Sequence, residues 1–101
     1  MTRKHIDYQE HLIDSLKDPI EAQAYLNAAL MDGDQEVFLL ALKHVLMAQG
    51  GDMTTLARES QLNRENLYRM FSQKGNPRLV SIRSVLHVLG LELAVQPYKD
   101  K

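Results

Sequence analysis

The spacing of hydrophobic residues predicts a chain built mainly from helices. Between residues 18 and 33 the apolar positions recur every three or four residues, as they do on one face of a helix: Ala22, Tyr25, Leu26, Ala29 and Leu30. Asp18 is a suitable N-cap, Pro19 suits the first helical position, and Glu21 can close a capping box. Asp32-Gly33-Asp34 is expected to end this helix and cap the next one.

A second helix is predicted over residues 35–49, and its pattern differs from that of the first. Apolar residues occupy nearly every side of it: Val37, Phe38, Leu39, Leu40, Leu42, Val45, Leu46 and Met47. A helix that is hydrophobic all round is normally buried on most sides, so we expect this one to lie at the centre of the core. Gly50-Gly51 is the expected stop.

The segment from Leu56 to Pro77 predicts two short helices joined by a tight turn, at about 53–60 and 64–73. Ala57 is small where two crossing helices approach each other, and Leu62 is placed to fill the turn. Leu67 and Met70 lie on one face of the second helix and should point into the core. This arrangement is typical of a helix-turn-helix, and it leaves polar side chains on the outer face of the second helix.

The remaining pattern completes an all-α domain of about five helices. A last helix is predicted over 81–89, with Ser81 as its cap, and apolar residues then alternate with polar ones from Leu91 to Gln96 as in a short strand. Residues 1–17 form an N-terminal arm that is helical or orders against a partner. The predicted organisation is therefore an arm (1–17), a helix-turn-helix domain (18–97) and a tail (98–101).

Composition and charge refine this picture. The chain has 101 residues, 45% of them hydrophobic and none of them cysteine, which fits one soluble, cytoplasmic domain without disulfides or thiolate metal sites. No apolar run is long enough to span a membrane. The net charge of −1 hides a division, because residues 1–36 carry −5 and residues 37–101 carry +4. An acidic half and a basic half suggest two different partners.

The outer face of the second short helix is the candidate for reading DNA bases. A major groove accepts one helix, and its base edges present distinct donors and acceptors. Arg64 can reach guanine, and Asn66 can pair with adenine or bond to a phosphate. Glu65 can accept from cytosine, but it also suits the positive end of the helix dipole, which is the slightly favoured interpretation. The complete predicted base-reading set is Asn63, Arg64, Glu65, Asn66 and Arg69.

Other residues near this helix are candidates for contacts with the DNA backbone. Such contacts fix the register of a protein on DNA and make binding salt-dependent, without reading sequence. The predicted phosphate-contacting residues are Thr54, Lys74, Arg78 and Ser81.

An ordered set of short motifs resembles a known family. The 56–77 segment looks like the helix-turn-helix of lambda-repressor-like, Cro-type proteins. Six motifs, covering about residues 18–97, resemble the addiction-module antidote proteins, which are HigA-like antitoxins: Tyr25-Leu26-Asn27 with Asp32-Gly33-Asp34, Ala48-Gln49-Gly50-Gly51, Arg64-Glu65-Asn66-Leu67-Tyr68, Gly75-Asn76-Pro77 and Leu89-Gly90-Leu91. Two positions depart from the general pattern: Gln61 replaces the usual turn glycine, and Met53 replaces a phosphate-binding glutamine.

The resemblance implies an antitoxin that binds a RelE/HigB-like toxin, represses its own operon at a double-stranded DNA operator, and dimerises. An acidic N-terminal half is a suitable complement to a basic toxin. The expected toxin-binding residues are Ile6, Tyr8, Leu12, Ile13, Leu16 and Tyr25. The expected dimer contacts are Leu91, Leu93 and Val95, on the strand whose edge would otherwise be unpaired.

Three other functions are weighed against this one. A helix-turn-helix regulator without a toxin has almost the same sequence signature, and a helical protein–protein adaptor would use the acidic arm alone. An enzyme is the least favoured, because the four histidines lack metal-ligand spacing and the chain has no Gly-rich phosphate loop or nucleophile elbow. We expect no cofactor and no metal.

Overall fold

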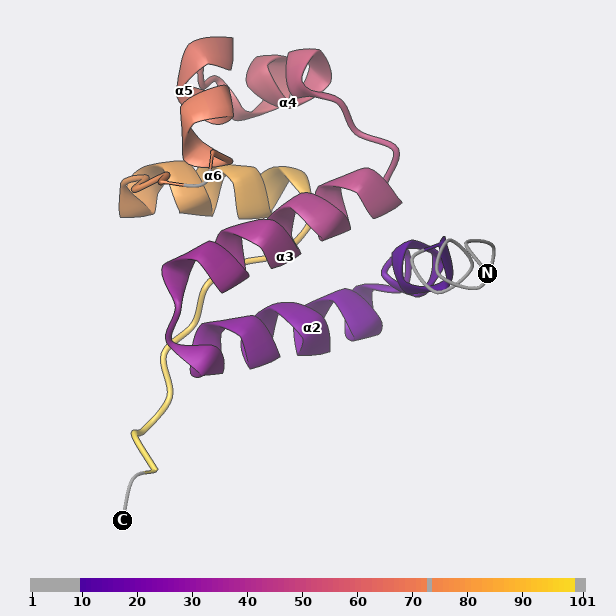
Figure 1. The fold of residues 1–101 in the computed structure, drawn as a ribbon, viewed down its shortest axis with the longest axis vertical. Coiled ribbons are helices and arrows are strands. Elements are labelled where there is room, and N and C mark those ends of the chain that lie inside the picture. The colour runs from indigo at the N-terminus through magenta and orange to yellow at the C-terminus, as the bar shows by residue number, and fades with distance from the viewer. Residues whose placement is uncertain (1–9, 73, 100–101) are drawn as a thin grey trace.

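The computed structural model describes residues 10–72 and 74–99, and it is helical (Figure 1). A short helical segment over residues 10–15 leads into the five labelled helices: α2 (Pro19–Asp32), α3 (Gln35–Ala48), α4 (Met53–Ser60), α5 (Arg64–Met70) and α6 (Leu79–Val88). Helix α2 packs on α3, and α4 packs on both α5 and α6. In Figure 1 the α4–α5 pair lies at one end of the molecule, α2 lies at the other, and α3 and α6 lie between them.

Side-chain caps set where four of these helices begin. In each case a carboxylate or amide oxygen accepts a hydrogen bond from a backbone N–H of the first turn, at 2.7 to 2.9 Å: Asp18 from Ile20, Asp34 from Glu36, Asp52 from Thr55 and Asn63 from Asn66. Such bonds satisfy donors that have no partner inside the helix. The predicted caps at Asp18, Asp34 and Asn63 are confirmed, and Asp52 adds one that the sequence pattern did not single out.

One hydrophobic core connects the two ends of the molecule. Leu42 and Val45 of α3 are completely buried, and so are Leu67 of α5 and Val85 of α6. The predicted central position of α3 is confirmed by these residues. The expectation that α3 is buried on most sides is wrong for its outer face, where three apolar side chains remain exposed: Val37, Leu40 and Met47.

Two helix boundaries differ from the prediction for local reasons. Helix α5 ends at Met70 rather than residue 73, and the Ser72 hydroxyl donates to the carbonyl of Arg69 at 2.7 Å just beyond its end. Helix α6 begins at Leu79, with Arg78 and not Ser81 at its N-cap. The backbone N–H of Ser81 donates to the Arg78 carbonyl at 3.0 Å, so Ser81 already lies inside the first turn.

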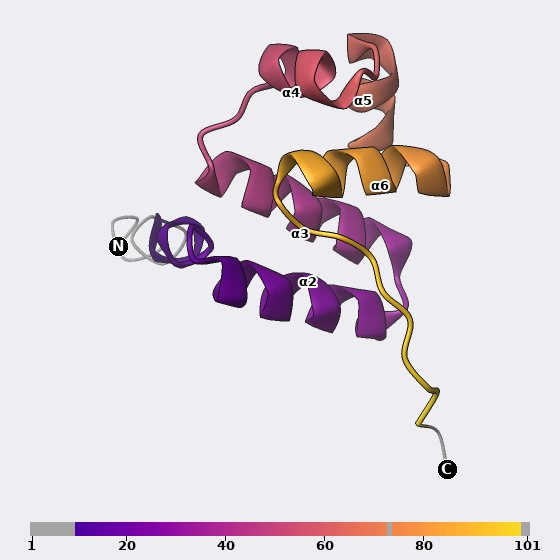
Figure 2. The same cartoon turned by 180° about the vertical axis from the view of Figure 1, so that it is seen from behind.

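The predicted strand from Leu91 to Gln96 is absent, and the described residues contain no other strand. Leu91 and Leu93 are half-buried against the core, whereas Val95 is 98% exposed. A strand requires a hydrogen-bonded neighbour. Figure 2 shows this segment passing beside α3 and α2 and then leaving the body of the protein, so the described residues supply no neighbouring strand for Val95.

Candidate nucleic-acid interface

The turn between α4 and α5 has the conformation that the sequence pattern requires. Gln61 has φ 65° and ψ 22°, which is the left-handed region where glycine is usual. The hydroxyl of Ser60, which is nearly buried, accepts the backbone N–H of Leu62 at 3.3 Å. The chain therefore makes the sharp turn with a glutamine in place of the usual glycine. The backbone at Gln61 is strained, because a side chain disfavours the left-handed conformation.

Helix α5 is divided into an inner and an outer face. Leu67 is completely buried and Met70 nearly so, while the polar residues predicted to read bases are all exposed: Asn63, Arg64, Glu65, Asn66 and Arg69. Asn63 uses its side-chain oxygen to cap the helix, which leaves only its amide group to donate elsewhere. The outer face is therefore free to meet a ligand, and its two arginines carry the positive charge.

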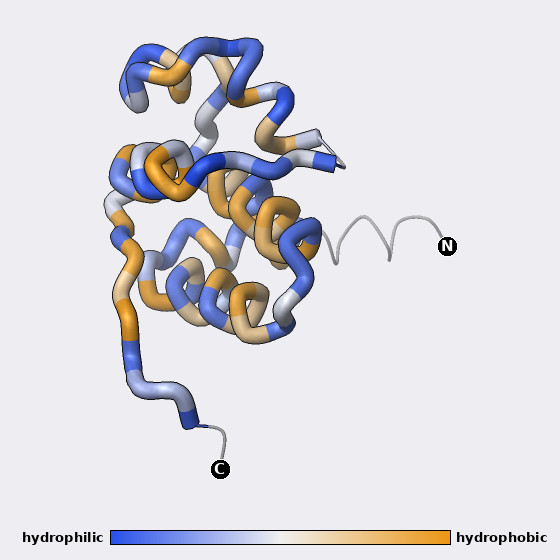
Figure 3. The backbone as a smooth tube through the Cα atoms, turned by 90° about the vertical axis from the view of Figure 1, so that its left-hand side faces the viewer, coloured by the Kyte–Doolittle hydropathy of each residue, from blue (hydrophilic) through white to orange (hydrophobic). Residues whose placement is uncertain are grey.

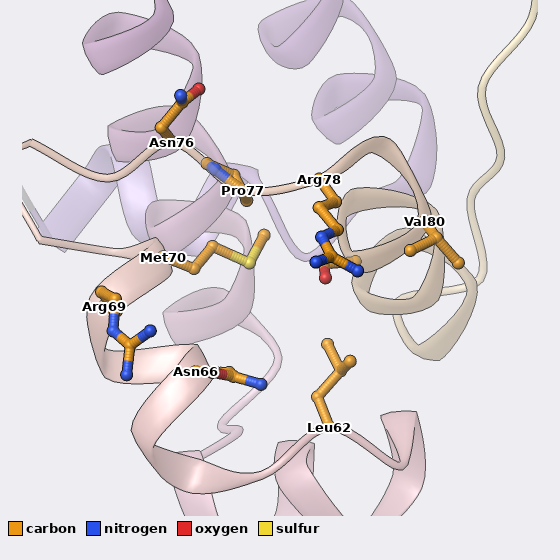
Figure 4. Close-up of a pocket in the computed structure, with 9 residues that line it drawn as sticks. Leu62, Asn66, Arg69, Met70, Asn76, Pro77, Arg78 and Val80 are labelled. Atoms are coloured by element: carbon orange, nitrogen blue, oxygen red, sulfur yellow. The ribbon is translucent and has the colours of Figure 1, made fainter.

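A hollow of about 440 Å³ lies between α5 and the start of α6. It brings together Asn66 and Arg69 of α5 with Arg78 and Ser81, which come from a separate part of the chain. Figure 4 shows Asn66 and Arg78 extending into the same space from opposite walls. Two predicted base-reading residues and two predicted phosphate-contacting residues thus share one site, whereas Arg64, Glu65, Thr54 and Lys74 lie outside its lining.

The hollow also contains a residue that the sequence pattern placed in a family motif but not in the predicted DNA-binding set. Asn76 lines it, and the side-chain oxygen of Asn76 accepts a hydrogen bond from Gln35 at 3.1 Å. The same Gln35 nitrogen donates to the carbonyl of Gly75 at 3.0 Å. These bonds join the start of α3 to a loop forty residues away, and no local signal could have indicated that contact.

Gly75 is required in this loop because the backbone passes close to the end of α5. A Cβ atom at this position would overlap the carbonyl oxygen of Met70 and would lie 2.8 Å from that of Arg69. These neighbours are backbone atoms and cannot move away as a flexible side chain could. The glycine therefore lets the loop turn tightly enough to bring Arg78 beside α5.

The start of α4 has its own electrostatic character. Hydrogen bonds from the backbone and side chain of Thr55 are the main causes that lower the pKa of Asp52 below its ordinary value of 3.8. The carboxylate is therefore charged at neutral pH and occupies backbone donors at the helix start. A phosphate contact by Thr54 would have to come from its hydroxyl, close to this negative charge.

The apolar residues of the arm that the structure describes pack against the core. Ile6 and Tyr8 lie outside the described residues. Leu12 and Ile13 are half-buried against the core, and Leu16 is only 2% exposed, so Leu16 stabilises the protein's own fold and is not accessible to a toxin. Tyr25 is half-buried, with its hydroxyl 2.7 Å from Nδ1 of His44 and the two ring centroids 6.0 Å apart.

Two further kinds of feature are absent from the described residues. These residues contain no group of three or more histidine, aspartate or glutamate side chains placed to hold a metal ion. None of their helices is both long and apolar enough to cross a membrane.

Together these features define a small protein whose regular structure is helical throughout the described residues, with an exposed polar face that carries Arg64 and Arg69 on its α4–α5 pair. Comparison with known proteins then shows its family. Residues 4–97 match the family described as probable addiction module antidote protein, and the chain belongs to that family. It is also 34% identical over 93 residues to an uncharacterized protein of Haemophilus influenzae. The aligned region covers 92% of this chain and 90% of the relative. No solved structure gives a significant match.

Proposed function

We propose that this protein is the antitoxin of a type II toxin–antitoxin module and a sequence-specific repressor of its own operon. In this proposal α4 and α5 form a lambda-repressor-like, Cro-type helix-turn-helix whose second helix enters the DNA major groove. The protein acts in the cytoplasm and is not an enzyme. Membership of the antidote family supports a toxin partner of some kind, and the chemistry of the α5 face supports the DNA operator.

The observation that carries the proposed DNA binding is the hollow beside α5, which is lined by two arginines. Arg69 and Arg78 approach it from two segments, and Asn66 adds an amide that can donate and accept. In this proposal a phosphate of the DNA backbone binds in the hollow and pairs with its arginines, while Arg64 at the exposed helix start contacts a base edge. The side chains of α5 thus supply both kinds of contact that sequence-specific binding needs.

The proposed binding of a toxin rests on membership of the antidote family and on the negative charge of the N-terminal part of the chain. The class of toxin that we propose is RelE/HigB-like, which is basic, and residues 1–36 of this chain carry a net charge of −5. Opposite charge speeds association and excludes wrong partners. The basic half of the chain holds the face proposed for DNA, so the two partners are expected to bind different ends.

A homodimer completes the proposal, because one helix-turn-helix reads only a half-site and operators mirror the two-fold symmetry of the protein. Val95 is almost fully exposed at the end of the alternating segment. Beside that segment, Leu93 lines an apolar groove together with Leu30 and Leu79, both of which are largely exposed. A second copy would pair with the backbone of residues 91–96 and cover these side chains.

The test of the DNA half is binding to the DNA upstream of the protein's own gene. We expect a gel shift that weakens steeply between 50 and 200 mM salt, since cations released from phosphates drive binding (roughly one per phosphate contact). Arg64→Ala should weaken binding by about 5- to 100-fold and relax sequence preference. Lys43→Ala removes the same charge from α3 and should leave the shift nearly unchanged.

The outcomes separate the competing functions. No salt-sensitive shift with the wild-type protein would exclude the repressor and leave the adaptor. DNA binding without a complex with the product of the neighbouring gene would favour a regulator that has no toxin. Equal losses from Arg64→Ala and Lys43→Ala would mean that general charge, and not the α5 face, drives binding.

A further inference from the structure

The outward face of α3 carries an uncovered apolar stripe. Val37, Leu40 and Met47 lie three, seven and ten residues apart, which places them on one side of the helix. Their exposed fractions are 40%, 54% and 47%. Figure 3 shows α3 as mainly hydrophobic, while the α4–α5 pair at the end of the molecule is mainly hydrophilic. A helix at the centre of the fold therefore keeps apolar surface that its own chain does not cover within the described residues.

The edge of this stripe is a fixed aromatic pair. His44 lies between Leu40 and Met47 along α3, and the hydroxyl of Tyr25 on α2 lies 2.7 Å from its Nδ1. The two rings are stacked with an interplanar angle of 29°. Burial is the main cause that lowers the pKa of His44, with Lys43 contributing, so the imidazole is neutral near pH 7. The pair thus widens the stripe without adding charge, and Lys43 is the exposed basic residue between Leu40 and Met47.

The segment that carries the stripe is acidic as a whole, although Lys43 is exposed between Leu40 and Met47. From residue 18 to residue 48, which covers α2, α3 and their caps, the chain has one basic residue and five acidic ones: Lys43 against Asp18, Glu21, Asp32, Asp34 and Glu36. All five carboxylates are exposed. DNA would be repelled here, and a second copy of the chain docked through this face would bring the same excess of negative charge. The complementary occupant is a protein with an apolar anchor inside a basic rim.

We propose that the toxin docks on the outward face of α3, with Leu40 and Met47 at the centre of the contact. This inference rests on the proposed antitoxin function, and it moves the contact from the arm to α3, because Leu16 is buried in the core. Leucine and methionine in the middle of an interface supply apolar area, and the flexible thioether adapts to the partner's shape. The exposed carboxylates of α2, α3 and their N-caps pair with lysines and arginines of the toxin.

The α3 site is separate from the face of α5 that is proposed to bind DNA. The α4–α5 pair lies at one end of the molecule, on the far side of α6 and away from α2 (Figure 1). A toxin seated on the outer face of α3 leaves the exposed face of α5 accessible. A toxin bound at the α3 site therefore does not compete with DNA for the α5 face.

The experiment uses the full chain and the purified protein encoded by the gene beside it. Met47→Glu and Leu40→Asp each place a charge at the centre of the proposed contact, and we expect each to weaken the complex by at least about tenfold in calorimetric titration. Met31→Glu is the matched control: Met31 is 80% exposed on α2, outside the stripe, and its change should have little effect. All three variants should keep the wild-type circular dichroism and gel shift.

Hydrogen exchange provides a second readout that does not depend on a variant. Toxin binding should slow exchange in α3 peptides that span residues 37–47 more than in α5. Protection confined to residues 10–16, or equal affinity of Met47→Glu and Met31→Glu, would overturn the α3 site while leaving the antitoxin function intact. Failure of the wild-type proteins to form a complex would overturn both. Conversion of a dimer to a monomer by Leu40→Asp alone would assign the stripe to self-association and overturn the proposal.

Discussion

The two ends of this protein expose opposite kinds of surface. At the α4–α5 end, apolar side chains such as Leu67 are buried and most exposed residues are polar, with arginines outnumbering carboxylates in the two helices. At the α2–α3 end, carboxylates are exposed together with apolar side chains such as Leu40. DNA is read by hydrogen bonds and charge, whereas proteins are usually bound through an apolar centre with a polar rim. The difference supports a division of labour between two partners within about 100 residues.

The largest effect should come from removing the core that both ends share. Leu42 of α3 is completely buried, and Leu42→Ala leaves a cavity that we expect to cost about 2–5 kcal/mol of unfolding free energy. Because one core connects the ends, unfolding in urea should remain a single transition, and DNA binding and toxin binding should be lost together. Two separate transitions would show that the ends fold independently. Lys43→Ala, next to it on the exposed side, is the control and should change stability little.

A smaller and more selective effect is expected from Gly75→Ala. The new methyl group would press on the carbonyl oxygens of Met70 and Arg69, so the loop that carries Arg78 must shift. We expect DNA affinity to fall by about tenfold with a destabilisation of about 1–3 kcal/mol, while toxin binding at α3 persists in the folded protein. Gel shifts and toxin titrations on the same preparation would check this. An equal loss of both activities would contradict the separation of the two ends.

Sequence reasoning was strongest where short-range chemistry decides the structure. Asp18, Asp34 and Asn63 act as caps through bonds to residues two or three positions away, so the starts of α2, α3 and α5 were predictable. The sharp turn at Gln61 follows from the spacing of residues around it. The start of α6 was missed because Ser81 resembles a cap, although α6 begins two residues earlier without a side-chain cap.

Local sequence patterns do not predict contacts between segments that are far apart along the chain. The hollow depends on Arg78 meeting Asn66 and on Gln35 holding the loop across forty residues. The exposed side of α3 was missed because an all-round apolar pattern does not reveal which side lacks a covering helix. The strand at Leu91–Gln96 was predicted from its alternation alone, yet a strand also needs a partner, and the alternation cannot say whether that partner is in the same chain.

A substitution in the turn between α4 and α5 should raise the stability of the protein, whereas the two changes above lower it. Gln61 is the only non-glycine residue with positive φ in the described part of the chain, and Gln61→Gly removes the cost of that conformation. We expect a gain of up to about 1 kcal/mol, which corresponds to a rise in Tm of about 4–8 °C, after allowing for the larger entropy of the unfolded chain. Gln49→Gly is the control, since Gln49 ends α3 with φ −89° and should lose stability on the same change. A loss at both positions would show that Gln61 is unstrained.

The smallest expected effect concerns pH and the acidic end alone. Burial lowers the pKa of His44 in the folded protein from its ordinary value of 6.5, so below that pH the unfolded chain binds a proton more readily than the folded one. The resulting stabilisation is fully present above pH 6.5 and is lost as the pH falls through the lower pKa of the folded state. Urea unfolding measures the free energy of unfolding, and His44→Gln should flatten its rise between about pH 5 and 7. His87→Gln, on the exposed side of α6, is the control for the loss of one imidazole and should leave that rise unchanged. An unchanged slope in His44→Gln would mean that the Tyr25–His44 pair opens easily, and it would remove the fixed edge from the surface proposed for the toxin.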